Sequence, residues 1–175
     1  ITDFIADAGR QNKPWLVWYA PMMPHTPHTP PAEYLAKYKG VAPTEPVAKY
    51  WAMIDWFDHT CGQLLDHLER EKLADNTIVV YLADNGWIQD PKGPLSVRSK
   101  KTPYDAGLRT PILVRWPAQV KPRAADEFAL SVDVLPTVLT ACGADVPAGL
   151  PGLNLFDPAA LAKRTTVAGA CFTHD

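Results

Sequence analysis

The apolar residues of the chain follow two patterns, one typical of helices and one typical of strands. Helices are predicted where apolar residues recur at every third or fourth position. These segments are residues 1–10, 32–38, 45–72 and 131–143. Strands are predicted where short apolar, β-branched or aromatic runs lie between turn residues, as in residues 14–20, 76–84 and 110–117. This alternation predicts the α/β class, with a mostly parallel, buried sheet flanked by helices.

The residues at the ends of these segments refine the boundaries. Thr44 is expected to cap the long helix, with Pro46 in its first turn. Ser131 is expected to cap the last helix and Gly143 to end it. No capping residue precedes Ile1, so we expect the chain to begin inside a helix and to be an internal part of a longer protein.

Composition narrows the classes of function. A chain of 175 residues suits one domain. The net charge of −2 and the lack of a Lys/Arg run argue against a nucleic-acid partner. The sequence also lacks an apolar stretch long enough for a membrane span. Cys61, Cys142 and Cys171 lie far apart, which predicts buried thiols rather than disulfides or a metal cluster.

Asp84 and Asn85 directly follow the predicted strand at residues 76–84. Ligand sites in open α/β sheets form beyond the carboxyl ends of strands. A carboxylate and an amide oxygen are hard donors that suit Ca²⁺ or Mg²⁺. The alternative is that the Asp-Asn-Gly triplet is only a turn.

Other chemically active side chains occupy two further loops. His25 and His28 follow the strand at residues 14–20, where a histidine can donate a proton or bind an oxyanion. Lys100 lies in a basic loop before the strand at residues 110–117. Both loops could equally be ordinary solvated connections. Together, the three loops would form a pocket for a metal ion and a doubly charged oxyanion.

The chain resembles the sulfatases of the alkaline-phosphatase-like superfamily. The resemblance rests on "PWLVWYAPMMPHTP", on "MIDWFDHTCGQLLDHLEREKLADNTIVVYLADNGW", and on "KKTPYDAGLRTPILVRWP" followed by "SVDVLPTVL". It extends over residues 1–175 and implies a partial sulfatase catalytic domain. The nucleophile region that precedes it in the family and the family's C-terminal subdomain are expected to be absent.

The resemblance also implies roles for individual residues. Asp84 and Asn85 would be ligands of the active-site divalent cation, usually Ca²⁺, with Mg²⁺ as the alternative. Lys100 would contact the sulfate and the leaving-group oxygen. His25 would bind the sulfate and act as proton donor, and His28, out of register for that role, ranks second. The ligand would be a small sulfate ester or a sulfated sugar.

The chain departs from the family at the nucleophile. Sulfatases use a formylglycine made from the cysteine of a C-x-P-S-R motif, and none of the three cysteines here lies in such a motif. We therefore expect the isolated chain to be inactive. Ala106 replaces a glycine of the family's "YEGG" turn. Two other functions compete: a phosphodiesterase or phosphonate hydrolase of the same superfamily, and a non-catalytic binding domain derived from the fold.

Overall fold

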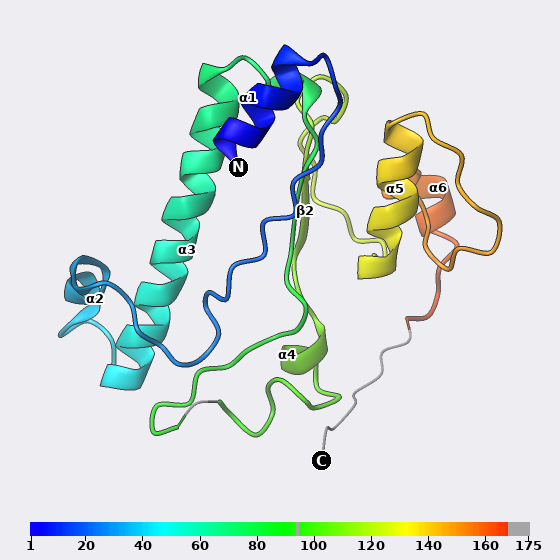
Figure 1. Cartoon of the computed structure of the whole chain (residues 1–175). Helices are drawn as coiled ribbons and strands as arrows, with labels where there is room; N and C mark the ends of the chain where they lie inside the picture. Colours follow the sequence, from blue (N-terminus) through cyan, green and yellow to red (C-terminus); the bar gives the residue numbers. More distant parts are fainter. Residues whose placement is uncertain (94, 168–175) are drawn as a thin grey trace. The chain divides into compact units, whose positions relative to one another are not determined.

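The computed structural model describes residues 1–93 and 95–167 of the chain (Figure 1). The chain divides into two compact units. The first consists of Ile1–Thr77 and Gln89–Ser96, and the second of Ile78–Ile88 and Val97–Asp175. His25 and His28 therefore belong to the first unit, whereas Asp84, Asn85 and Lys100 belong to the second.

The first unit is helical, and its helices confirm the predicted periodicity. They are α1 (Thr2–Arg10), α2 (Ala32–Tyr38), α3 (Glu45–Arg70) and the short 3₁₀ helix η1 (Ala74–Asn76). Helix α2 packs beside α3 (Figure 1). Thr44 does precede α3 and Pro46 lies in the first turn, but the Thr44 hydroxyl makes no capping hydrogen bond.

Residues 14–20 are not the buried strand that the sequence predicts. They carry no strand hydrogen-bonding pattern, and their side chains alternate between half-buried and exposed. Trp18 is 83% exposed. On the opposite side, Tyr19 contacts α3: its ring stacks on Phe57 with centroids 6.4 Å apart, and its hydroxyl donates to Thr60 Oγ1 at 2.8 Å. The segment is therefore extended and covered on one side only.

The second unit contains the two strands that the described residues form, β1 (Val79–Leu82) and β2 (Ile112–Arg115). They pair antiparallel, with Leu82 opposite Ile112 and Val79 opposite Arg115. The predicted mostly parallel sheet is not confirmed, because this one described pair runs in opposite directions. Leu82 is also exposed, so the prediction of a strand covered on both faces is wrong for β1.

The remaining elements of the second unit are helical. They are α4 (Asp105–Leu108), the 3₁₀ helix η2 (Ser131–Asp133), α5 (Val134–Ala141) and α6 (Pro158–Leu161). The predicted helix over residues 131–143 thus appears as η2 continued by α5, which ends at Ala141, two residues before Gly143 with its φ of +68°. The Ser131 cap is wrong, because Ser131 is itself the first residue of η2 and Leu130 occupies the cap position.

The structure also bears on two other predictions, which concern membrane spans and the cysteines. Within the described residues, no helix is both long and apolar enough to cross a membrane. The described cysteines are free. Cys61 is half-buried, with a pKa raised by burial, whereas Cys142 is exposed and so differs from the predicted buried thiol. Cys171 lies outside the described residues.

Candidate active site

The Asp84–Asn85 pair lies two residues beyond the end of β1, and its hydrogen bonds orient its oxygen atoms. The Asn85 backbone N–H donates to Asp84 Oδ1 at 2.9 Å, and the Asn85 Nδ2 group donates to the Gly86 carbonyl at 3.0 Å. The amide nitrogen of Asn85 is thus used within the loop. Its amide oxygen and the second carboxylate oxygen of Asp84 accept no hydrogen bond from the described residues. These two hard oxygen donors fit a divalent cation such as Ca²⁺.

The antiparallel pairing places the basic loop beside this pair. Leu82 at the end of β1 lies opposite Ile112 at the start of β2. The segment after β1 and the segment before β2 therefore leave the strand pair at the same end. Two hydrogen bonds join these segments. The Gly86 N–H donates to the Gly107 carbonyl at 3.0 Å, and the Ile88 N–H donates to Ser99 Oγ at 2.6 Å.

Close backbone contacts explain both glycines of this junction. A Cβ on Gly86 would lie 2.1 Å from the Ala106 carbonyl oxygen, and a Cβ on Gly107 would lie 2.5 Å from the Ser99 carbonyl oxygen. Any side chain would therefore force the two loops apart. Ala106, the departure from the family's "YEGG", lies in the short helix α4 with ordinary helical backbone, so the loss of that glycine leaves the turn intact.

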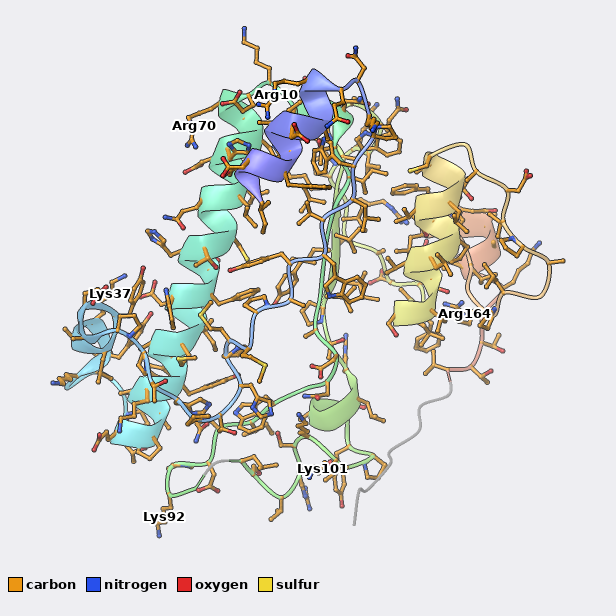
Figure 2. All side chains as sticks on the ribbon, in the orientation of Figure 1. Arg10, Lys37, Arg70, Lys92, Lys101 and Arg164 are labelled. Carbon is orange, nitrogen blue, oxygen red and sulfur yellow. The ribbon has the colours of Figure 1, made fainter. Side chains whose placement is uncertain are left out.

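Lys100 lies between Ser99, which is buried, and Lys101, whose backbone is strained. Ser99 is fully buried, whereas Lys101 is exposed and has a left-handed backbone, with φ of +67°. Lys101 is on the connection before α4, within the second unit (Figure 2). Lys100 itself is half-buried and makes no ion pair with the described residues. The structure thus brings Lys100 into the same local assembly as Asp84 and Asn85.

The two histidines differ in environment. His25 is exposed, and its Nδ1 lies 2.7 Å from the Thr26 carbonyl, to which it donates, so Nε2 is the nitrogen left for proton exchange. His28 is half-buried with its ring centroid 5.4 Å from that of Tyr50 on α3. Burial lowers the pKa of His28, with the charge of His25 acting in the same direction, and a hydrogen bond to the Pro24 backbone opposes the shift. His25 therefore suits a proton donor better than His28.

The described residues do not complete a metal site by themselves. They contain no group of three or more His, Cys, Asp or Glu side chains placed to hold one ion. The pair Asp84–Asn85 supplies one carboxylate and one amide, so further ligands would have to come from other oxygen donors. Because His25 lies in the other unit, its convergence with this pair stays a prediction from the sequence.

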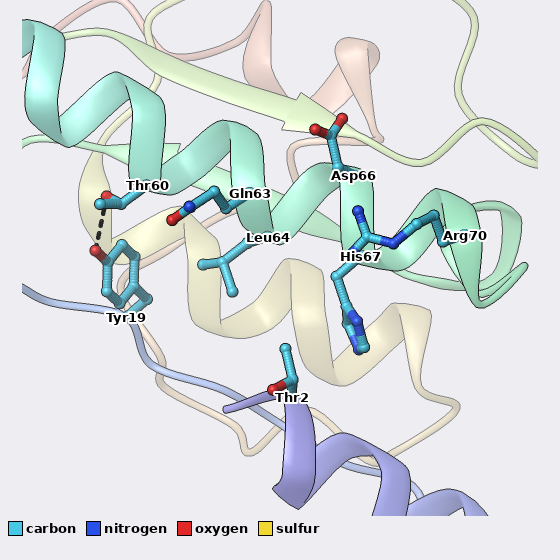
Figure 3. A pocket seen from close by; sticks show the side chains of 8 residues that line it. All are labelled: Thr2, Tyr19, Thr60, Gln63, Leu64, Asp66, His67 and Arg70. Atoms are coloured by element: carbon cyan, nitrogen blue, oxygen red, sulfur yellow. Dashed lines mark hydrogen bonds between the residues drawn. The ribbon is translucent and has the colours of Figure 1, made fainter.

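A cavity of about 500 Å³ lies elsewhere, in the first unit between α1 and α3 (Figure 3). Its lining is about equally polar and apolar and includes Thr2, Gln63, His67 and Arg70. None of the predicted site residues lines it. The cavity belongs to the first unit, whereas the cation pair and Lys100 belong to the second, and we assign it no part in the candidate site.

Comparison with known proteins decides the family. The family model described as Sulfatase matches residues 1–144 of this chain. The chain belongs to the sulfatase family. Two curated sulfatases illustrate the relationship. A sulfatase of Formosa agariphila is 27% identical over 162 residues, and human arylsulfatase A is 31% identical over 150 residues.

These alignments cover most of this chain but a small part of the relatives. They include 84% of the chain and 29% of the Formosa protein, and 83% of the chain and 28% of arylsulfatase A. The chain therefore spans less than a third of the length of these two sulfatases. The sequence resemblance to sulfatases is confirmed, and the matched residues 1–144 include the loops that contain the candidate site.

Solved structures agree on the fold. The crystal structure of Ps i-CgsB superposes with a TM-score of 0.80 at 25% identity, covering 93% of this chain and 36% of that one. A phosphonate monoester hydrolase of Silicibacter pomeroyi is less similar, with a TM-score of 0.56 at 27% identity over 68% of this chain and 24% of that one. The sulfatase, alkaline-phosphatase-like fold is thus supported by its neighbours, although the described strands form only one antiparallel pair.

Proposed function

We propose that the protein containing this chain hydrolyses sulfate esters and that the chain supplies the cation-binding and sulfate-binding side of the active site. The observation that carries the proposal is the hydrogen-bonded junction of the Asp84–Asn85 loop with the Lys100 loop. It joins the loop of the two oxygen donors to the loop that carries Lys100. A cation and a lysine held on two joined loops can both bind one tetrahedral dianion.

Each residue has a distinct role in this proposal. Asp84 and Asn85 hold the divalent cation, preferably Ca²⁺ and alternatively Mg²⁺, through one carboxylate and one amide oxygen. When bound, such a cation lowers the pKa of an attacking hydroxyl and offsets negative charge on the sulfate. Lys100 contacts the sulfate and the leaving-group oxygen, where its charge stabilises the departing oxyanion.

The proton for the leaving group comes from His25 in this proposal. Its Nδ1 is engaged by the Thr26 carbonyl, which leaves Nε2 to donate. We expect His25→Gln to lower kcat for a substrate with a poor leaving group, such as an alkyl sulfate, by at least about tenfold. His28→Gln is the matched control and should change kcat less than threefold. Equal losses in the two variants would remove His25 from this role.

The substrate is proposed to be a sulfated sugar or a small sulfate ester. One relative, from Bacteroides thetaiotaomicron, is named N-acetylglucosamine-6-O-sulfatase and is 32% identical over 107 residues, which are 61% of this chain and 19% of that protein. Ps i-CgsB has also been solved in complex with k-i-k-neocarrahexaose. These names support a carbohydrate substrate without selecting one sugar.

The decisive experiment compares matched substrates on the complete gene product. We expect a higher kcat/KM for an aryl sulfate than for the corresponding aryl phosphate, and we expect chelation of divalent cations to abolish the sulfatase activity. The second candidate, phosphonate or phosphodiester hydrolysis, is supported by the Silicibacter neighbour. An amide at position 85 instead of imidazole argues against a zinc pair and hence against this alternative. A clear preference for the phosphate would overturn the proposal.

The nucleophile is the part of the reaction that the chain does not supply. In sulfatases it is a formylglycine, and no cysteine here lies in the motif that is converted to it. We therefore propose that the 175-residue chain alone does not turn over an aryl sulfate. Measurable turnover by the isolated chain would contradict this assignment of roles.

A further inference from the structure

Ser99 is a fully buried polar residue directly before Lys100, and its two polar groups bind two different segments. Its hydroxyl oxygen accepts the Ile88 backbone N–H at 2.6 Å, and its carbonyl oxygen accepts the Thr102 hydroxyl at 2.6 Å. A buried hydroxyl is retained at low cost only when it is hydrogen-bonded, as this one is. Ser99 therefore fixes the chain on both sides of Lys100.

The Ile88 bond matters because of where Ile88 lies. It follows Asn85 by three residues, so the Ser99 hydroxyl ties the loop of the candidate cation ligands to the loop of the candidate sulfate-binding lysine. The Gly86–Gly107 hydrogen bond, 3.0 Å long, makes a second tie between the same two loops. Of the two ties, only the one from Ser99 uses a side chain and can be removed by substitution without changing the backbone.

The backbone on the other side of Lys100 is restricted as well. Lys101 has φ of +67°, a strained conformation for a residue with a side chain, which persists only where neighbouring contacts enforce it. The hydrogen bond from Thr102 to Ser99 closes this turn around Lys100 and Lys101. The backbone of Lys100 is therefore held on both sides by its neighbours.

Electrostatics explains why such a restraint has value. A divalent cation on Asp84 and Asn85 would repel the Lys100 ammonium, so an unrestrained lysine would move away when the cation binds. With its backbone restrained, Lys100 keeps its place in the loop, and the cation and the ammonium can then attract the same dianion. We infer that Ser99 is a positioning residue that couples cation binding at Asp84–Asn85 to sulfate binding at Lys100. This inference rests on the proposed function and deepens it.

Coupling can be measured directly by calorimetry on the complete gene product, with inorganic sulfate and Ca²⁺ as the probes. In the wild type, Ca²⁺ is expected to tighten sulfate binding about tenfold, and by reciprocity sulfate tightens Ca²⁺ binding by the same factor. In Ser99→Ala we expect this factor to fall below about threefold, while sulfate binding without Ca²⁺ changes less than threefold. The matched control is Ser131→Ala, an exposed serine of the same unit, which should keep the full factor.

A second variant protects the test against misfolding. If Ser99→Ala does not fold, Thr102→Val removes the hydrogen bond to the Ser99 carbonyl and should lower the coupling factor in the same direction. A loss of thermal stability with the coupling factor unchanged would show that Ser99 is only structural and would overturn the inference. Absence of Ca²⁺ and sulfate binding in the wild type would instead overturn the proposed function, so the two failures are distinguishable.

Discussion

Replacing Arg164 with methionine would break the buried ion pair of the second unit. Arg164 follows α6 (Figure 2). Its guanidinium donates to both carboxylate oxygens of Asp133, at 2.6 and 2.7 Å. The side chain of Asp133 is 0% exposed and that of Arg164 is 10% exposed. The pair therefore lies in an interior where solvent screens it little, and it joins the start of α5 to the segment after α6.

The expected loss of unfolding free energy depends on the hydrogen bonds that Asp133 would keep. Removing one partner of a buried pair costs about 3–5 kcal/mol, because the other charge stays buried without compensation. Here the Leu130 and Leu153 backbone N–H groups, both at 2.7 Å, would still bind the carboxylate. The hydrogen bond from Arg164 to the Phe128 carbonyl at 2.9 Å would also disappear. We expect a loss of about 3 kcal/mol, at the lower end of that range.

Urea unfolding of the 175-residue chain, followed by circular dichroism, measures this loss. Arg123→Met is the matched control, because it removes an arginine from a more exposed pair with Glu127, in which the two side chains are 47% and 21% exposed at a distance of 3.4 Å. Such pairs contribute less than about 1 kcal/mol. If Arg164→Met and Arg123→Met lowered the free energy of unfolding equally, the burial argument would be refuted.

The same pair predicts a dependence on pH. Burial opposes ionisation of Asp133, but the hydrogen bonds from Arg164, Leu153 and Leu130 outweigh it and lower its pKa. An unfolded Asp titrates near about 3.9. Because the folded pKa is lower, the stabilisation is complete above that value and is lost as the pH falls through the folded pKa. The difference in unfolding free energy between wild type and Asp133→Asn should therefore be constant from pH 7 to 5 and shrink below about pH 4.

Three further predictions concern the candidate site and its glycines. Gly86→Ala would place a Cβ 2.1 Å from a backbone carbonyl oxygen and should lower the free energy of unfolding in urea by about 2 kcal/mol. The control is Gly62→Ala in helix α3, where nothing lies within 4 Å of the added Cβ, and it should raise that free energy by about 0.5–1 kcal/mol. Lys100→Met should raise the Kd for inorganic sulfate, measured by calorimetry with Ca²⁺ present, by about tenfold, and Lys101→Met by less than threefold. Asp84→Asn should weaken Ca²⁺ binding about tenfold or more in a calorimetric titration, and an unchanged Kd would exclude Asp84 as a ligand.

The helices could be predicted from the sequence because their signals are local. The apolar repeats locate α2 and α3, and Gly143 provides the left-handed residue just after α5. They do not specify the buried faces, because α2 has no buried residue and Trp51 and Ile54 of the α3 stripe are exposed. Thr44 does occupy the N-cap position of α3, although its hydroxyl makes no capping hydrogen bond. The Ser131 prediction was wrong, because Leu130 occupies the cap position of η2 and its N–H donates to the Asp133 carboxylate.

Strand pairing could not be predicted in the same way because it depends on distant residues. Residues 14–20 have the composition of a strand, but the described part of the chain provides no partner for their backbone, so they stay extended and exposed on one side. The direction of β1 against β2 is equally non-local. A parallel pair needs a crossover connection, usually a helix, whereas the described residues between Leu82 and Ile112 contain one helix, the four-residue α4.

The antiparallel direction of the described strand pair bears directly on the site. In a parallel pair, the loop before β2 and the loop after β1 would leave the strands at opposite ends. Lys100 would then lie far from Asp84 and Asn85. The antiparallel register brings these loops together. Gly86 shows that this proximity is built into the sequence. A turn-forming Asp-Asn-Gly would need its glycine at positive φ, but Gly86 is not among the positive-φ glycines and instead accommodates the Ala106 carbonyl. The glycine of the triplet is therefore explained by its close contact with the loop that carries Lys100. A simple turn would not require that contact.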